Sequence, residues 1–311
     1  NLFSICFFLI FVQYIILKNK IHLIHARSFI PGLISFLIKK FNKIRYIYDI
    51  RGFWLDEKVD RLDYKKNLIF NFLKKIEKNI YLNSDHIIFL TEESYKIVNK
   101  MYFKNTLKNY SVIPTCADKN IFYPKLKERR TYINLGYVGT VTGAYDFDKI
   151  INFIAELIKV DFNFKLTIIN NNEHNFILKL INYYKIPKRN YELLSLKREE
   201  INDTLNKVDI GLFYVKKNYS IKASFPTRIA EFLMCGKPIM SNLFNNDMEK
   251  LALNGLIYKN NYSTHNIKNE IFNLKTFVSK YDENFIRQFA IENLSLDFAK
   301  INLIKIYNKL L

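Results

Sequence analysis

The chain has 311 residues, of which 49% are hydrophobic and 25% are charged, a balance typical of a globular protein and not of a disordered one. This length is sufficient for two domains that each have their own core. Lysine and arginine number 48 against 29 acidic residues, and the formal net charge of +19 can attract nucleic acid, anionic lipid or a phosphorylated substrate. Because the lysines are spread over the whole chain, compositional bias explains the excess equally well.

The three cysteines are scattered and odd in number, with no CxxC pair. This argues against a disulfide framework and against structural zinc, and it favours a reducing compartment. They are Cys6, Cys116 and Cys235.

An apolar run over residues 2–17 opens the chain. It is shorter than the ~20 residues that a membrane helix needs, and Ser4 and Gln13 interrupt it. No basic region precedes it and no small-residue cleavage site follows, which argues against a signal peptide. We expect a buried helix of an α/β domain in preference to a membrane anchor. Because the chain begins with Asn1 and not methionine, we also expect a fragment that lacks its first elements.

Strand-like and helical stretches alternate along the first third of the chain. Strands separated by helices predict right-handed βαβ units and a parallel sheet. The predicted strands are 21–26, 45–49, 86–90 and 111–113, with helices over 33–41 and 67–83 among the segments between them.

A change of pattern at residues 113–124, with two prolines and polar turn residues, indicates an interdomain linker. We therefore expect a first domain over 1–117 and a second domain over 118–311, closed by a helix over 296–311. Two doubly wound domains place a ligand cleft at the carboxyl ends of their facing strands. In the second domain the predicted strands are 134–138, 165–169, 209–214, 238–241 and 255–258.

The stretch from Ser224 to Ile239 is the most informative part of the chain. Ser224 can cap a helix, and Pro226 suits the first helical position, where its missing N–H was unpaired in any case. Gly236 supplies a stop. The helix therefore opens with free backbone N–H groups near Pro226 and Thr227, which form a site for phosphate.

Glu231 lies three residues after Arg228 and four after Thr227, so the three share one helix face just inside this phosphate site. An anion site, a cation and a carboxylate suited to a sugar hydroxyl together indicate a nucleotide-diphosphate ligand.

Several short motifs occur along the chain in the order found in glycosyltransferase family 4, the retaining enzymes with the two-domain GT-B fold. The chain therefore resembles this family. The resemblance covers nearly all 311 residues and lacks only the family's first βα unit, which agrees with a truncated, incomplete first domain. It rests on His25–Arg27, Tyr48–Trp54, Ser84–Thr91, Val112–Asp118, Gly136–Thr140 and Pro226–Pro238.

By this resemblance, residues 1–117 form the acceptor-side domain and residues 118–311 the nucleotide-sugar-binding domain. Glu231 then binds the ribose hydroxyls of the donor. The alternative is a first-turn glutamate that is favourable there because of the helix macrodipole. The family has a further glutamate eight positions earlier, where this chain has Ala223, and this departure puts sugar contact in doubt.

The family also places an arginine and a lysine in the loop after the first strand of the second domain. Here the loop 140–146 has neither, although Gly139, Thr140 and Gly143 allow close backbone approach to a diphosphate. We expect Lys222 and Arg228 to supply the missing charge, the alternative being that both are solvated surface cations. Such charge stabilises a diphosphate leaving group without a metal, and we expect neither a metal site nor a cofactor.

Ser195 belongs to a loop, residues 194–197, that by resemblance borders the nucleobase; an ordinary surface loop is the alternative. In the first domain, Asp49 and Arg51 lie where a strand meets a loop. They contact the acceptor or the reacting sugar, or they form a buried pair that holds the loop. His25 is the nearest histidine, with an acceptor contact or a strand-end role.

The resemblance implies transfer of a sugar from a nucleotide-diphosphate sugar to a saccharide or lipid-linked acceptor, with retention. Its setting is the synthesis of surface polysaccharide or lipopolysaccharide, in the cytoplasm or at the inner face of the plasma membrane. A nucleotide-sugar 2-epimerase or a catalytically degenerate GT-B partner are the alternatives, and no stripe of basic and aromatic residues indicates nucleic acid. Two lysine clusters can rest on anionic lipid or simply be solvated: Lys39, Lys40, Lys43 and Arg45, and Lys65, Lys66, Lys74, Lys75 and Lys78.

Overall fold

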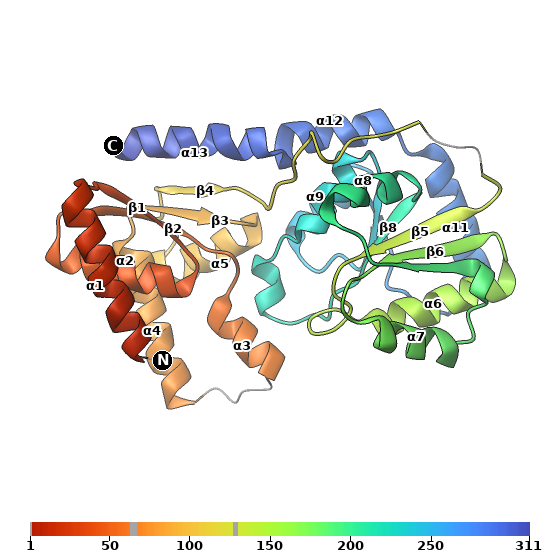
Figure 1. Ribbon diagram of the computed structural model, residues 1–311, viewed down its shortest axis with the longest axis horizontal. Helices are drawn as coiled ribbons and strands as arrows, with labels where there is room; N and C mark the ends of the chain where they lie inside the picture. Colours follow the sequence, from red (N-terminus) through yellow and green to blue (C-terminus); the bar gives the residue numbers. More distant parts are fainter. Residues whose placement is uncertain (1, 63–66, 127–129) are drawn as a thin grey trace. The chain divides into compact units, whose positions relative to one another are not determined.

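The computed structural model describes residues 2–62, 67–126 and 130–311, and the chain divides into two compact units (Figure 1). The N-terminal unit contains 1–114, 218–225 and 299–311, and the C-terminal unit contains 115–217 and 226–298. The N-terminal unit thus takes two short segments from the second half of the chain. The domain ranges expected from the sequence stay predictions, because compactness alone does not show which parts fold independently.

The N-terminal unit is built on a four-stranded parallel sheet in the order β1-β2-β3-β4. The strands run in chain order, and the helices between them provide the parallel crossovers. Its elements are α1 (Leu2–Asn19), β1 (Leu23–Arg27), α2 (Phe29–Phe41), β2 (Arg45–Asp49), α3 (Trp54–Leu62), α4 (Leu68–Asn83), β3 (His86–Phe89), α5 (Glu92–Phe103), β4 (Tyr110–Val112) and the 3-10 turn η2 (Ser220–Ala223); most of α13 (Leu296–Leu310) also belongs to it.

The C-terminal unit has a six-stranded parallel sheet in the order β10-β9-β8-β5-β6-β7. Strand order reverses at β5, because β6 pairs on one side of it and β8 on the other; this is the switch point where such sheets bind ligands. Its elements are β5 (Ile133–Val138), α6 (Phe147–Val160), β6 (Phe164–Ile169), α7 (His174–Tyr183), η1 (Lys188–Asn190), β7 (Tyr191–Leu194), α8 (Arg198–Asn206), β8 (Ile210–Phe213), α9 (Thr227–Met234), β9 (Ile239–Ser241), α10 (Asn246–Leu253), β10 (Ile257–Lys259), α11 (Ile267–Lys280) and α12 (Glu283–Leu294).

Helices cover both faces of this sheet, with α6 and α7 on one face and α8 and α9 on the other (Figure 1). The main core lies under α6, whose apolar face is almost wholly buried against β5 and β6. On the opposite face α9 lies close to β8, since a Cβ at Gly211 would come within 2.8 Å of the Phe232 ring. This close packing fixes the helix that carries Arg228 and Glu231.

Both sheets confirm the α/β fold with two Rossmann-like domains that the sequence predicts. Arg45–Asp49 has the predicted bounds, and the other predicted strands differ by a few residues at their ends. Helix α2 begins at Phe29, earlier than the predicted residue 33. Pro31 is tolerated because it lies in the first turn, where backbone N–H groups have no helical partner.

Helix α1 corrects the expectation of a buried helix. Ile16 is buried against α2, but Phe7, Ile10 and Leu17 are each about two-thirds exposed, at 65%, 68% and 65%. Among the helices of the described residues, none is long and apolar enough to cross a membrane. Two residues of the predicted lysine clusters, Lys65 and Lys66, lie outside the described residues.

Candidate nucleotide-sugar site

Helix α9 begins at Thr227, with Pro226 as its N-cap residue. The predicted cap at Ser224 is wrong, since this residue follows η2 and Phe225 intervenes before the helix. Pro226 has no side-chain group that could cap the helix, and the first backbone N–H groups of an α-helix have no partner within the helix, so they can bind a ligand. The predicted stop is confirmed, because the helix ends at Met234 and Gly236 follows with φ +72°.

Arg228 places its guanidinium at the carboxyl end of β5. A Cβ built on Gly139, where φ is +98°, would lie only 2.7 Å from its Nη2 atom. The guanidinium lies 4.5 Å from the centroid of the Tyr145 ring and 5.5 Å from that of Phe213. Its Nη1 atom is buried and has no hydrogen-bond partner among the described residues. A buried cationic donor without a partner at a strand end suits an oxyanion.

A pocket of about 480 Å³ lies beside this arginine, at the carboxyl ends of β5 and β6. Its volume is within the range of small-ligand sites. Thr140 lines it, and the Thr140 carbonyl accepts a hydrogen bond of 2.6 Å from the Tyr137 hydroxyl. The lining residues are Val138, Gly139, Thr140, Ile169, Asn170, Asn171, Asn172, Glu173, Leu196 and Ile201.

Glu231 lies one turn into α9, and its side chain is only 12% exposed. The nearest cation is Arg198, with Nη2 4.0 Å from the carboxylate. Burial raises the pKa of Glu231 above its usual 4.5, and the charges of Arg198 and Arg228 only partly oppose this. The carboxylate is therefore desolvated without a close hydrogen-bond donor, and a ligand hydroxyl can supply one.

Glu173 is a residue of this pocket that the sequence did not indicate. Its carboxylate accepts hydrogen bonds from the Val141 backbone N–H at 2.9 Å, the Thr142 hydroxyl at 2.6 Å and the Asn170 amide at 2.9 Å. Burial acts to raise the pKa of Glu173, but these hydrogen bonds outweigh it and lower the pKa below 4.5. The Gly-rich loop is thus held by an internal anion.

Ser195 and Gly143 lie at the margin of the site. The Ser195 hydroxyl is 3.3 Å from His174 Nε2 and is solvent-exposed. Gly143 has φ +75°, and nothing lies within 4 Å of a Cβ built there.

Lys222 lies in the N-terminal unit, as part of η2, while Arg228 and Gly139 lie in the C-terminal unit. Its Nζ atom is 3.6 Å from Glu93, and its backbone carbonyl accepts a hydrogen bond from Thr91. The next residue, Ala223, is fully buried in the core of the same unit. A segment that the sequence assigns to one domain therefore packs with the other.

In the N-terminal unit, His25, Asp49 and Arg51 come together at the carboxyl ends of β1 and β2. Asp49 Oδ2 lies 3.5 Å from His25 Nε2, and Oδ1 lies 4.0 Å from Arg51 Nη1. Arg27 adds a second arginine, with Nε 3.8 Å from Asp49 Oδ2. Strand pairing explains the cluster, since Arg27 and Asp49 are register partners in parallel strands.

Tyr307 joins this cluster from α13, with its hydroxyl 2.7 Å from His25 Nδ1. No sequence pattern indicates this contact across 282 residues. Arg27 was within reach of sequence reasoning, because it follows His25 by two residues on one strand and so shares its face.

No protein-family model matches the sequence, and no curated protein matches it. Among solved structures, the chain is similar to a glycosyltransferase from Rickettsia africae ESF-5, with a TM-score of 0.75 and 16% identity over 100% of this chain and 82% of that chain. It is also similar to sucrose-phosphate synthase from Thermosynechococcus elongatus, with a TM-score of 0.73 and 14% identity over 97% of this chain and 77% of that one. The fold is GT-B.

The GT-B fold is also that of HepE from Anabaena, which was solved in complex with UDP. That chain matches with a TM-score of 0.71 and 11% identity over 97% of this chain and 82% of its own. At these identities the similarity establishes the GT-B fold alone.

Proposed function

We propose that the protein is a glycosyltransferase that moves a sugar from a nucleotide-diphosphate sugar to a saccharide or lipid-linked acceptor. The observation that carries this proposal is the position of the Arg228 guanidinium against Gly139 at the switch point of the C-terminal sheet, with an Nη1 atom that is buried and has no hydrogen-bond partner among the described residues. The pocket beside it has the size of a small-ligand site, and the GT-B neighbours include one with bound UDP.

Each donor group has a residue suited to it. The Arg228 guanidinium binds an oxygen of the diphosphate, together with the first N–H groups of α9. Glu231 accepts hydrogen bonds from the ribose hydroxyls. The base occupies the pocket next to Leu196 and Ile201. No metal is part of this proposal, because Arg228 and the α9 N-terminus supply the positive potential that the leaving diphosphate needs.

Transfer proceeds with retention by front-face displacement. The bond between the anomeric carbon and the diphosphate oxygen breaks, and its electron pair stays with the diphosphate. The acceptor oxygen forms the new bond on the same face, and its proton passes to the leaving diphosphate. His25, Asp49 and Arg51 contact the acceptor or the reacting sugar.

The proposed setting is cell-surface polysaccharide or lipopolysaccharide synthesis, at the inner face of the plasma membrane. The apolar side chains that α1 exposes support membrane contact, as do the exposed Lys75 and Lys78 on α4.

A screen against UDP-, GDP- and ADP-sugars, by thermal shift and by release of nucleotide, tests the function. We expect one donor to raise the unfolding temperature, since a ligand at 100 times its Kd stabilises by about 2.7 kcal/mol. Binding without turnover on any saccharide or lipid-linked acceptor favours the degenerate partner, and conversion of the free donor sugar favours the 2-epimerase. If no nucleotide stabilises the protein, both the glycosyltransferase and the 2-epimerase proposals are wrong.

Glu231→Gln tests the ribose contact. The change removes a charge-assisted hydrogen bond worth about 1.5–3 kcal/mol, so nucleotide affinity falls about 10- to 100-fold. Glu249→Gln, an exposed position on α10, is the matched control and keeps the parent affinity.

The ligand-free stability of Glu231→Gln separates loss of binding from loss of folding. Because the folded pKa of Glu231 is raised, its contribution to stability is full below about pH 4.5 and is lost as pH rises through the folded value. At pH 7.5 the ionised carboxylate is therefore unfavourable, and Gln leaves the unfolding temperature unchanged or higher. A clear drop in that temperature would contradict this account.

A further inference from the structure

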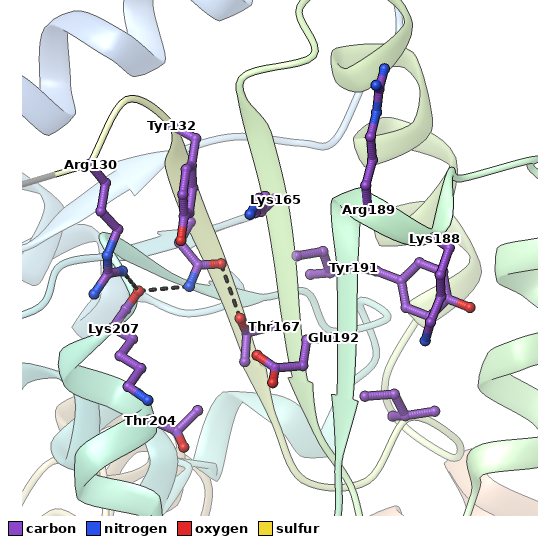
Figure 2. Close-up of a pocket in the computed structure, with 13 residues that line it drawn as sticks. Arg130, Tyr132, Lys165, Thr167, Lys188, Arg189, Tyr191, Glu192, Thr204 and Lys207 are labelled. Carbon is purple, nitrogen blue, oxygen red and sulfur yellow. Dashed lines mark hydrogen bonds between the residues drawn. The ribbon is translucent and has the colours of Figure 1, made fainter.

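A second pocket, of about 520 Å³, lies in the C-terminal unit at the opposite end of its sheet (Figure 2). It is lined by residues at the amino ends of β5, β6 and β7, whereas the proposed donor pocket lies at the carboxyl ends of β5 and β6. Because these two strands have six residues each, the pockets are separated by roughly 20 Å. The second pocket shares no lining residue with the first.

The floor of this pocket is an unusual sheet face. Strand register places Asn134 beside Lys165, and Thr167 beside Glu192, all on one face. The Thr167 hydroxyl donates to Asn134 Oδ1 at 3.1 Å, as Figure 2 shows. Parallel strands covered on both faces by helices normally carry apolar side chains there. A polar, charged floor at this end of the sheet is therefore adapted to something other than core packing.

Basic side chains surround the floor. Figure 2 shows Arg130 and Lys207 on one side, Lys188 on the other and Lys165 between them. Among the described residues of the lining, Glu192 is the single acidic one, and five are basic. The five are Arg130, Lys165, Lys188, Arg189 and Lys207.

Aromatic rings hold two of these cations in place without neutralising them. Lys165 Nζ lies 4.0 Å from the centroid of the Tyr132 ring, and Lys188 Nζ lies 4.5 Å from that of Tyr191. Within the described part of the chain, neither lysine pairs with a carboxylate, and the same is true of Lys207. Other lysines of this unit do have such partners.

Lys237, for example, pairs with Glu283 at 2.6 Å, and Lys275 with Asp161 at 2.5 Å. Clustered like charges repel one another, and a bound anion relieves this repulsion. The high net charge of the chain does not by itself explain why these basic side chains converge on one concave, polar site, with three lysines that have no carboxylate partner among the described residues.

We propose that this pocket binds an oligophosphate, a ligand with two or more linked or neighbouring phosphate groups. Cations on two sides and in the middle suit several charges spread over one ligand better than a single anion. The volume suits a small molecule, and lysine ammonium groups bind phosphate as point charges. This proposal does not depend on the proposed donor site.

Calorimetric titration of the full chain with inorganic tripolyphosphate tests it. The pocket variant is Lys165→Ala/Lys188→Ala/Lys207→Ala. Its control, Lys250→Ala/Lys268→Ala/Lys280→Ala, removes the same charge from exposed lysines elsewhere in the C-terminal unit. We expect the pocket variant to weaken tripolyphosphate binding at least tenfold and the control to stay within about twofold. Nucleotide binding through Glu231 stays unchanged in both variants, which keeps this test separate from that of the proposed function.

Glu192→Gln changes the pocket in the opposite direction and keeps the test valid if the triple variant does not fold. Removing the single carboxylate strengthens tripolyphosphate binding about threefold or more. Equal losses in the pocket variant and the control would show a general charge effect and overturn the proposal, as would no binding by the parent protein. Pocket-dependent binding to phosphatidylglycerol vesicles without binding to tripolyphosphate would also overturn it, in favour of a lipid surface.

Discussion

Arg228 and Gly139 depend on each other at the proposed donor site. The backbone of Gly139 has φ +98°, and its missing side chain leaves the space in which the guanidinium lies. The Tyr145 and Phe213 rings lie within cation–π distance of the guanidinium and help to hold it beside Gly139. In the donor proposal, the positive charge for the diphosphate thus comes from α9 and not from the loop after β5.

Gly139→Ala tests this dependence. The new methyl group would lie 2.7 Å from Arg228 Nη2, so the guanidinium must move, and we expect nucleotide affinity to fall about tenfold. Gly143→Ala is the control: its φ of +75° imposes a similar backbone strain, but nothing lies within 4 Å of the added Cβ. Equal losses of affinity in the two variants would show that loop strain, and not the position of Arg228, governs binding.

At the scale of elements, the end of α9 is fixed by its contact with α12. Lys237 is fully buried, and its Nζ atom pairs with Glu283 at 2.6 Å. Arg287 donates a hydrogen bond to the Met234 carbonyl in the last turn of α9. A cation at the carboxyl end of a helix stabilises the helix by pairing with its last carbonyl groups. Helix α12 therefore anchors the element that carries both proposed donor residues.

Gly236→Ala probes this junction. At φ +72° any side chain is strained, and its Cβ would lie 2.9 Å from the Glu283 carbonyl oxygen. Gly255→Ala, at φ +73° with nothing within 4 Å, isolates the backbone strain, which costs about 1–2 kcal/mol. We expect Gly236→Ala to lower the free energy of unfolding by about 2 kcal/mol more than Gly255→Ala in urea titrations. A difference near zero would mean that α12 moves away from the added methyl group at little cost in free energy.

At the scale of the whole molecule, the apolar surface of α1 has a testable consequence. We expect vesicles that contain phosphatidylglycerol to co-sediment the protein, and Phe7→Ser/Phe11→Ser to reduce the bound fraction several-fold because apolar area is lost. Phe272→Ser/Phe285→Ser removes two exposed phenylalanines from the C-terminal unit and is the matched control. If both variants bind as the parent does, charge or another surface accounts for any membrane contact.

The fold was within reach of the sequence because its signals are local. Strand β2 has the predicted bounds, and Gly236 ends the donor helix where turn chemistry predicts. The exact start of α9 could not be predicted from the sequence. Ser224 and Pro226 both satisfy local rules for a helix start, and only packing decides between them. The expectation that α1 is buried was wrong for a similar reason. A run of apolar residues does not show which other elements pack against it.

The candidate site shows the same division. Spacing alone placed Thr227, Arg228 and Glu231 on one helix, and strand-end positions singled out Asp49 and His25. Tertiary structure decided that Lys222 and Arg228 belong to different units, that Glu173 holds the Gly-rich loop and that Tyr307 reaches His25. Periodicity and turn chemistry act over a few residues, whereas these contacts join segments 32 to 282 residues apart that only the packed fold brings together.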